Sequence, residues 1–294
     1  MDVGLMVPQG WKGEFDGWEP RAAWERSVAL ARDAERLGFE SLWVFDHFTT
    51  VPEPTDEITF ESFTMLGALA QATERARIGH MVVCTGFRNP ALTAKMSSTL
   101  DVVSGGRFEL GIGAGWKEDE WVAYGYGFPD TPTRLAMFAD HLEVITRMLG
   151  PGRATYLGEH ASVQGAVNVP KGLQSPRVPI VVGGNGRRVT FRLAARFADE
   201  LNLVFLDPAA TAEAMAVARE RCEEIGRDPA SLKVSVYVWG LPADVSPGQE
   251  RVERLLEFAE AGLDMAIVQG YMGTTEPAAL DSLIEDCLAT GLLS

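Results

Sequence analysis

Glycines alternate along one short apolar segment of the chain, and a tryptophan follows them. Residues 107–116 read Arg-Phe-Glu-Leu-Gly-Ile-Gly-Ala-Gly-Trp, with Gly111, Gly113 and Gly115 at alternate positions. Without β-carbons at these positions, a flat ligand can lie directly against the backbone. Glycines at the end of a strand can also do no more than make a tight turn. A single cluster of this kind leaves both interpretations open.

Asp46 and His47 directly follow a second apolar segment, residues 41–45. An imidazole at such a position can donate or accept a proton during a reaction. It can equally cap a backbone group and have no chemical role. The sequence contains three further histidines: His80, His141 and His160. None of the four shows the spacing of a His-x-His or His-Glu-x-x-His metal motif, so we expect no catalytic metal.

A third cluster, Gly183-Gly184-Asn185-Gly186-Arg187, connects an apolar segment to a helical one. Backbone N–H groups at the N-terminus of a helix bind phosphate through unsatisfied donors and aligned dipoles. A plain glycine turn is the alternative, but Arg187 and Arg188 favour an anion in a chain whose net charge is −15. Arg188, Arg192 and Arg196 share one helix face, which is either a solvated surface or a contact for an acidic cofactor tail.

The elements that must position these residues alternate along the chain. Strands are expected at residues 3–7, 41–45, 76–84, 107–112, 179–182, 200–205, 232–239 and 265–269. Helices are expected at residues 21–37, 63–73, 90–103, 133–149, 187–197, 211–225, 249–261 and 277–289. Strict alternation demands a parallel sheet. Eight such units within 294 residues favour a closed (β/α)8 TIM barrel over an open doubly wound sheet.

Residues 150–177 contain too many glycines and prolines for regular core structure. We therefore expect a single α/β barrel domain spanning residues 1–294, with an insertion after the fourth helix at about residues 150–177. Active sites of such barrels lie at the C-terminal ends of the strands. Residues 46–47, 81–86, 113–116 and 183–187 all fall at such ends, which indicates one common site.

Composition narrows the range of partners. The net charge of −15 argues against nucleic acid, because the field of the whole protein repels phosphates. The three isolated cysteines, Cys84, Cys222 and Cys287, fit a reducing cytoplasm. The sequence shows neither a signal-peptide pattern nor an apolar stretch long enough to span a bilayer. We expect a cytoplasmic protein that binds a small-molecule substrate, with no membrane or nucleic-acid partner.

Several motifs occur together in the order that is typical of the luciferase-like monooxygenase superfamily. They are Ser-Leu-Trp-Val-Phe-Asp46-His47-Phe, Arg88-Asn-Pro-Ala-Leu-Thr-Ala-Lys95, Leu110-Gly-Ile-Gly-Ala-Gly-Trp116, Val-Pro-Ile-Val-Val-Gly183-Gly-Asn-Gly186 and Ala-Ala-Arg-Phe-Ala-Asp199. The resemblance as a whole covers most of residues 1–205. The sequence is most similar to the branch of the superfamily that uses the deazaflavin coenzyme F420.

The resemblance implies a barrel fold, a homodimer and a cofactor bound at the strand ends. It implies a non-prolyl cis peptide bond between Met81 and Val82 behind the cofactor ring. It places His47 near the reacting ring carbon, as a proton donor or acceptor or as a substrate anchor. Asp46 would set the tautomer of His47 or bond the ring system. The cofactor contacts implied in this way are Asp46, Met81, Val82, Gly113, Ala114, Gly115, Trp116, Gly183, Gly184, Asn185, Gly186 and Arg187.

The implied function is hydride transfer between F420 and a small organic substrate. One alternative is an FMN-dependent monooxygenase that uses reduced flavin and oxygen, and another is a non-catalytic flavin-binding barrel. The sequence departs from the family where Ala198-Asp199-Glu200-Leu201-Asn202 replaces the usual Ala-Asp-Gly-Trp-Asn. Residues 206–294 carry no recognised motif, so the substrate stays open. Five aromatic residues line an apolar pocket or belong to the core or a dimer surface: Trp11, Trp18, Phe48, Phe87 and Trp116.

Overall fold

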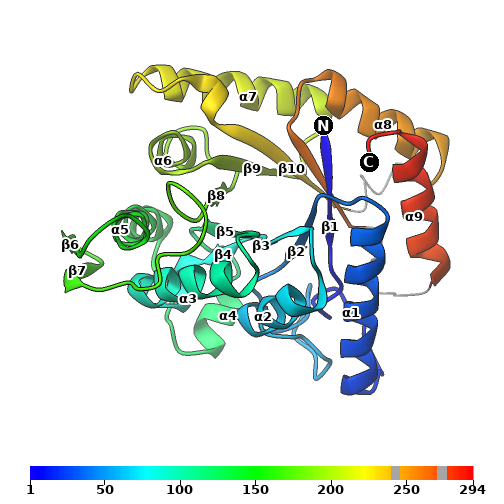
Figure 1. Ribbon diagram of the computed structural model, residues 1–294, viewed down its shortest axis with the longest axis horizontal. Coiled ribbons are helices and arrows are strands. Elements are labelled where there is room, and N and C mark those ends of the chain that lie inside the picture. The colour runs from blue at the N-terminus through cyan, green and yellow to red at the C-terminus, as the bar shows by residue number, and fades with distance from the viewer. Residues whose placement is uncertain (240–245, 270–276, 294) are drawn as a thin grey trace.

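The computed structural model describes residues 1–239, 246–269 and 277–293. Its parallel strands form a closed ring with helices on the outside (Figure 1). The ring consists of β1 (Asp2–Met6), β2 (Ser41–Val44), β3 (Arg77–His80), β4 (Val83–Cys84), β5 (Phe108–Gly113), β8 (Ile180–Gly183), β9 (Glu200–Val204), β10 (Lys233–Trp239) and β11 (Met265–Gln269). The ring closes because β1 pairs with both β2 and β11. The predicted (β/α)8 TIM barrel is therefore confirmed.

The third strand of the barrel is interrupted. Both β3 and β4 pair with β5, so they are two parts of one of the eight barrel strands. The predicted strand at 76–84 is thus divided at Met81 and Val82. The peptide bond between these two residues is cis, as the resemblance implied.

Helices follow the strands in sequence and cover the outside of the barrel (Figure 1). They are α1 (Pro20–Arg36), α2 (Ser62–Ala72), α3 (Pro90–Val103), α5 (Thr131–Leu149), α6 (Thr190–Phe197), α7 (Pro208–Glu223), α8 (Gln249–Glu260) and α9 (Pro277–Ala289). In α1, α3 and α7 a proline opens the helix directly after a capping side chain that accepts a backbone N–H. Proline suits the first turn because its missing N–H would have had no partner there.

Among the α-helices of the described residues, one was not predicted. The loop after β5 forms the short helix α4 (Glu118–Ala123), where the sequence shows only an acidic run ahead of Trp121. A helix of 6 residues is too short for a periodic apolar pattern to reveal it. Three acidic residues in its first turn suit the positive end of the helix dipole.

Residues 150–177, all of which the structure describes, add no strand to the barrel. They form an antiparallel hairpin of β6 (Ala154–Leu157) and β7 (Ser162–Ala166). The hairpin lies beyond α5, at the left edge of Figure 1. The hydroxyl of Tyr156 donates to Asp140 of α5 at 2.6 Å, which fastens the hairpin to the barrel.

The two faces of the barrel strands differ in character. On the outward face, Phe108, Leu110 and Ile112 of β5 belong to the large apolar core between strands and helices. The inward face of the same strand carries Glu109, Gly111 and Gly113. Strands that are buried on both sides are typical of parallel sheets covered by helices.

The glycines of β5 and β8 make room for the third barrel strand. A β-carbon on Gly111 would lie 1.8 Å from the carbonyl oxygen of His80. One on Gly113 or Gly183 would lie 2.8–2.9 Å from the methyl groups of Val82. The space above these glycines is therefore filled by the chain itself, and Val82 forms part of the barrel interior. Of the three alternating glycines, Gly111 and Gly113 thus accommodate the inward turn of residues 80–82, whereas a β-carbon on Gly115 would meet Cys84 and Trp121.

The sequence predicted no membrane partner and a homodimer. In the parts of the chain that the structure describes, no helix is both long and apolar enough to cross a membrane. The structure describes one chain, so the homodimer stays a prediction.

The steric role of Gly111 leads to a prediction about stability. We expect Gly111→Ala to lower the free energy of unfolding by about 2–4 kcal/mol, because the new β-carbon collides with backbone that cannot swing away. Gly67→Ala is the matched control: nothing lies within 4 Å of its β-carbon, and Gly67 sits inside α2. This control should stabilise by about 0.5–1 kcal/mol. Urea unfolding curves measure both changes, and equal stabilities for the two variants would contradict the steric argument.

Candidate active site

A cavity of about 500 Å³ opens at the C-terminal ends of the barrel strands. It is lined by residues that follow or end five of the strands, β2, β4, β5, β8 and β9, among others. Ten of the residues predicted for the site line this cavity: Asp46, His47, Met81, Val82, Gly113, Ala114, Gly115, Trp116, Gly183 and Gly184. Asn185, Gly186 and Arg187 lie outside its lining. A concave, mostly apolar pocket at this end of a barrel is the usual position of a ligand site.

The imidazole of His47 is held in place from two sides. Its Nδ1 lies 2.7 Å from Oε2 of Glu120 and donates to that carboxylate. Its ring stacks on Trp11, with ring centroids 4.2 Å apart and planes 3° from parallel. The hydrogen bond at Nδ1 fixes the tautomer of a neutral imidazole. Nε2 has no hydrogen-bond partner in the described residues and is left for a ligand.

Glu120 comes from the unpredicted helix α4 and is 1% exposed. Its second oxygen, Oε1, accepts the backbone N–H groups of Phe48 at 2.9 Å and Thr49 at 3.1 Å. One buried carboxylate therefore fixes both the His47 ring and the loop that carries it. Hydrogen bonds to a charged acceptor are about twice as strong as neutral ones.

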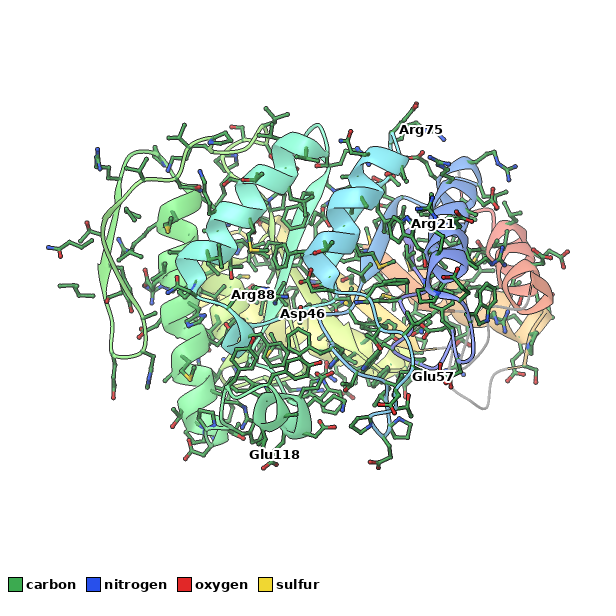
Figure 2. All side chains as sticks on the ribbon, turned by 90° about the horizontal axis from the view of Figure 1, so that it is seen from below. Arg21, Asp46, Glu57, Arg75, Arg88 and Glu118 are labelled. Atoms are coloured by element: carbon green, nitrogen blue, oxygen red, sulfur yellow. The ribbon has the colours of Figure 1, made fainter. Side chains whose placement is uncertain are left out.

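Asp46 does not contact His47 in the way that the sequence suggested. Its carboxylate forms a two-pronged ion pair with Arg88, at 2.7 and 2.9 Å, and Figure 2 shows the two side chains next to each other. It also accepts hydrogen bonds from Ser62 and from the backbone N–H of Cys84. The tautomer of His47 is set by Glu120, and the expectation that Asp46 does so is wrong. Asp46 instead ties the loop after β2 to the start of α3 and to β4.

These partners also decide the charge of Asp46. Burial alone would raise the pKa of this carboxyl, but the Arg88 guanidinium, helped by the Cys84 amide, holds it below the ordinary value. Asp46 is therefore a fixed anion at neutral pH. A carboxylate that is already paired and ionised is poorly suited to carry protons in a reaction.

The loop after β8 is braced by a side chain. The amide of Asn185 donates to the carbonyl of Val204 at 2.8 Å and accepts its N–H at 3.0 Å, as a neighbouring strand would. Gly184 has φ of +128°, a conformation that strongly favours glycine. Its own N–H donates to the carbonyl of Asn202 at 2.9 Å, so it is not free to bind an anion.

The arginines after this loop mostly join helices to one another. Arg192 pairs with Glu224, which directly follows α7, at 3.3 Å, and Arg196 pairs with Glu143 of α5. Arg187 pairs with Glu213 at 3.4 Å. All three arginine side chains are roughly half exposed, so each pair contributes little to stability. The interpretation of 192 and 196 as a solvated face fits these contacts.

Three of the five aromatic residues singled out in the sequence line the cavity: Trp11, Phe87 and Trp116. Trp18 instead packs its edge against Phe15, and Phe48 packs between Phe87 and Tyr124. The lining also includes residues that were not among the predicted contacts, such as Lys117, Glu120, Asn202 and Tyr237. An acidic residue three positions after a lysine does not by itself indicate that its side chain turns inward.

The contacts of Glu120 generate a prediction about local dynamics. We expect Glu120→Ala to raise hydrogen–deuterium exchange of the Phe48 and Thr49 amides about tenfold or more, because both lose their acceptor. Glu118→Ala is the matched control, since Glu118 is an exposed residue of the same helix. Mass spectrometry of peptides covering residues 45–52 measures the exchange. Unchanged exchange in Glu120→Ala would mean that another contact holds this loop.

Comparisons with known proteins agree with this geometry. Pyrimidine monooxygenase RutA of Stutzerimonas stutzeri is 28% identical over 238 residues, which are 77% of this chain and 65% of that protein. An F420-dependent glucose-6-phosphate dehydrogenase of Microbacterium testaceum is 34% identical over 167 residues, 56% of this chain and 48% of that protein. The chain thus spans between about half and two thirds of the length of these relatives.

Solved structures share the fold over nearly the whole chain. An F420-dependent secondary alcohol dehydrogenase, solved with an F420–acetone adduct, superposes with a TM-score of 0.80 at 21% identity and covers 98% of both chains. At that identity the likeness concerns the fold alone. The model of one family matches residues 1–282. The chain belongs to the luciferase-like monooxygenase family.

Proposed function

We propose that this protein is an oxidoreductase that exchanges a hydride between coenzyme F420 and a small organic substrate. The observation that carries the proposal is the His47–Glu120 pair: a fixed imidazole, with Nε2 available, at the wall of an apolar cavity of about 500 Å³. Similarity to an F420-dependent dehydrogenase over 56% of the chain supports the choice of cofactor.

The residues of the cavity fit a flat cofactor with a phosphate. Val82 and Ala114 offer apolar surface on which a ring can lie. Gly184 and Thr190 also line the cavity. A β-carbon placed on Gly184 would have only the Thr190 methyl group within 4 Å, so the space beside Gly184 is open. A side chain at 184 would fill this space. The phosphate would be held at the edge of the cavity by the Thr190 hydroxyl, at the first residue of α6, and by N–H groups of residues 185–187 in the loop before this helix.

F420, when bound, supplies a hydride carrier, because a carbon atom replaces N5 of the flavin ring. The protein has to manage the proton that accompanies hydride movement. If the substrate is an alcohol, Nε2 of His47 accepts the hydroxyl proton, and Glu120 stabilises the resulting imidazolium through Nδ1. Trp11 keeps the ring oriented by stacking. In the reverse direction the same Nε2 returns the proton.

A second candidate is a monooxygenase that uses reduced FMN and oxygen. The similarity to pyrimidine monooxygenase RutA extends over 77% of this chain, more than the similarity to the F420-dependent dehydrogenase. Nothing in the cavity lining separates the two cofactors, since both carry a flat tricyclic ring and a phosphate. The distinction therefore needs a binding measurement.

The cofactor prediction is tested by titrating the purified protein with F420, FMN and FAD. We expect F420 to bind about tenfold or more tightly than either flavin, measured by quenching of cofactor or tryptophan fluorescence. Tighter binding of FMN would replace the proposal with the monooxygenase. Binding of F420 without turnover of any alcohol or carbonyl substrate in a broad screen would favour a non-catalytic barrel.

The role of His47 is tested by separating rate from binding. We expect His47→Ala to lower the single-turnover rate of cofactor reduction about 10²–10⁴-fold, because a positioned proton acceptor is lost. The cofactor dissociation constant should change far less, since phosphate and ring contacts come from other strands. His160→Ala, which alters a histidine outside the cavity, is the control. A fully active His47→Ala would show that the residue only supports the loop.

A further inference from the structure

Asn202 presents an unsatisfied acceptor to the floor of the cavity. The residue lies on the inward face of β9, opposite Gly183 of β8 and Ser235 of β10. It is fully buried, yet it is part of the cavity lining. Within the described residues, its Oδ1 has no hydrogen-bond partner. A buried acceptor without a partner is rare in folded proteins and requires an explanation.

The other half of the amide is held in place by a chain of hydrogen bonds. Nδ2 of Asn202 donates to Oγ of Ser235 at 2.9 Å, and that hydroxyl donates to Oε1 of Glu200 at 2.5 Å. A hydroxyl has one hydrogen. While Ser235 donates to Glu200, its oxygen can only accept from Asn202. The amide is therefore oriented with Nδ2 toward Ser235 and Oδ1 toward the cavity.

The surroundings of Oδ1 within the cavity offer it no donor. Its neighbours on the adjacent inward positions include Val204 of the same strand, Gly183 of β8, and Tyr237 of β10, whose hydroxyl donates to Gln269. Val82 covers the inner side of Gly183. A buried acceptor without a partner is costly, and a ligand that supplies an N–H or O–H at this point removes that cost.

We propose that Asn202 recognises the ring of the cofactor by accepting a hydrogen bond from its cyclic imide N–H. This inference rests on the proposed function, in which a flavin-type ring occupies the cavity. F420 and FMN both carry this N–H between two ring carbonyls, so the recognition is the same for either cofactor. Ser235 and Glu200 act as positioning residues, because they fix which atom of the amide faces the ring.

The test compares rings that differ by one methyl group. One pair is FMN and N3-methyl-FMN, and the other is the deazaflavin riboside of F420 and its N3-methyl derivative. Methylation removes the imide N–H and leaves the rest of the ring unchanged. Dissociation constants for all four are measured by fluorescence titration with the wild type and with Asn202→Leu, whose side chain has the same branching and number of heavy atoms and no acceptor.

Asn168→Leu serves as the matched control. Asn168 is also fully buried, but it lies outside the cavity and both ends of its amide are bonded, to Met148 at 3.0 Å and to Ser98 at 3.0 Å. We expect Asn168→Leu to lower the melting temperature of the ligand-free protein by several degrees. Asn202→Leu should leave it nearly unchanged, because the unsatisfied acceptor disappears and Ser235 keeps its bond to Glu200.

In the wild type and in Asn168→Leu, we expect the N–H form of a ring to bind about tenfold more tightly than its methylated form. In Asn202→Leu this ratio should fall below about twofold. Ser235→Ala, which frees the amide to rotate, should give an intermediate ratio and provides a second variant if Asn202→Leu does not fold. A residue with only a structural role would not lower the preference for the N–H ring over its methylated form.

Three results would overturn the inference. The wild type could fail to distinguish the methylated rings. The tenfold ratio could persist in Asn202→Leu, which would show that the methyl group is excluded by its size. Asn202→Leu could weaken the binding of all four rings by the same factor. Binding of the flavin pair alone would contradict the choice of F420 and leave the test of Asn202 intact, whereas binding of no ring would contradict both.

Discussion

The shape of the site depends on a steric constraint deep in the barrel: the third strand can turn inward only where its neighbours lack β-carbons. Gly111 leaves room for the carbonyl of His80, while Gly113 and Gly183 leave room for the methyl groups of Val82. Protein interiors are close-packed, so such a turn requires positions without side chains on the adjacent strand β5 and on the next strand, β8. The turn supplies the cavity with an apolar, branched floor. The strand resumes at β4, whose backbone N–H at Cys84 then reaches Asp46.

Two buried carboxylates beside this floor have different roles, which their partners assign. Asp46 meets Arg88, and the ion pair keeps it ionised and links the loops after β2 and β4. Glu120 meets an imidazole and two backbone amides, and it leaves one nitrogen of His47 available to a ligand. A paired guanidinium keeps a carboxylate ionised and fixed in place, whereas an imidazole held at one ring nitrogen still offers the other to a ligand or a proton. The chemistry of the site therefore belongs to the second pair.

The sequence predicted the barrel because the alternation of eight strands and eight helices is a long-range pattern that few folds can satisfy. It also located most of the cavity, since strand ends in a parallel barrel must converge. The sequence did not predict which partner each side chain faces, because that depends on the direction in which the side chain points. His47 and Glu120 are 73 residues apart, and no periodicity reports which carboxylate a side chain will face. The alternating glycines identified a close approach but not its occupant, because an absent β-carbon admits a ligand and a neighbouring strand equally well.

The interior below the cavity shows how a barrel can hold polar groups without holding many charges. Burial, followed by the nearby carboxylate of Glu109, raises the pKa of Glu200 to about 8. Its Oε1 accepts the Ser235 hydroxyl, which gives this buried carboxyl a polar partner. Glu109 pairs with Arg77 at 2.5 Å, which offsets its own charge. Glycine, which the family commonly has at the position of Glu200, could not orient Ser235. Glu200, where the sequence departs from the family motif, and Asn202 are thus two ends of one hydrogen-bonded chain. In the proposed recognition of the ring, Glu200 acts on the ligand through that chain.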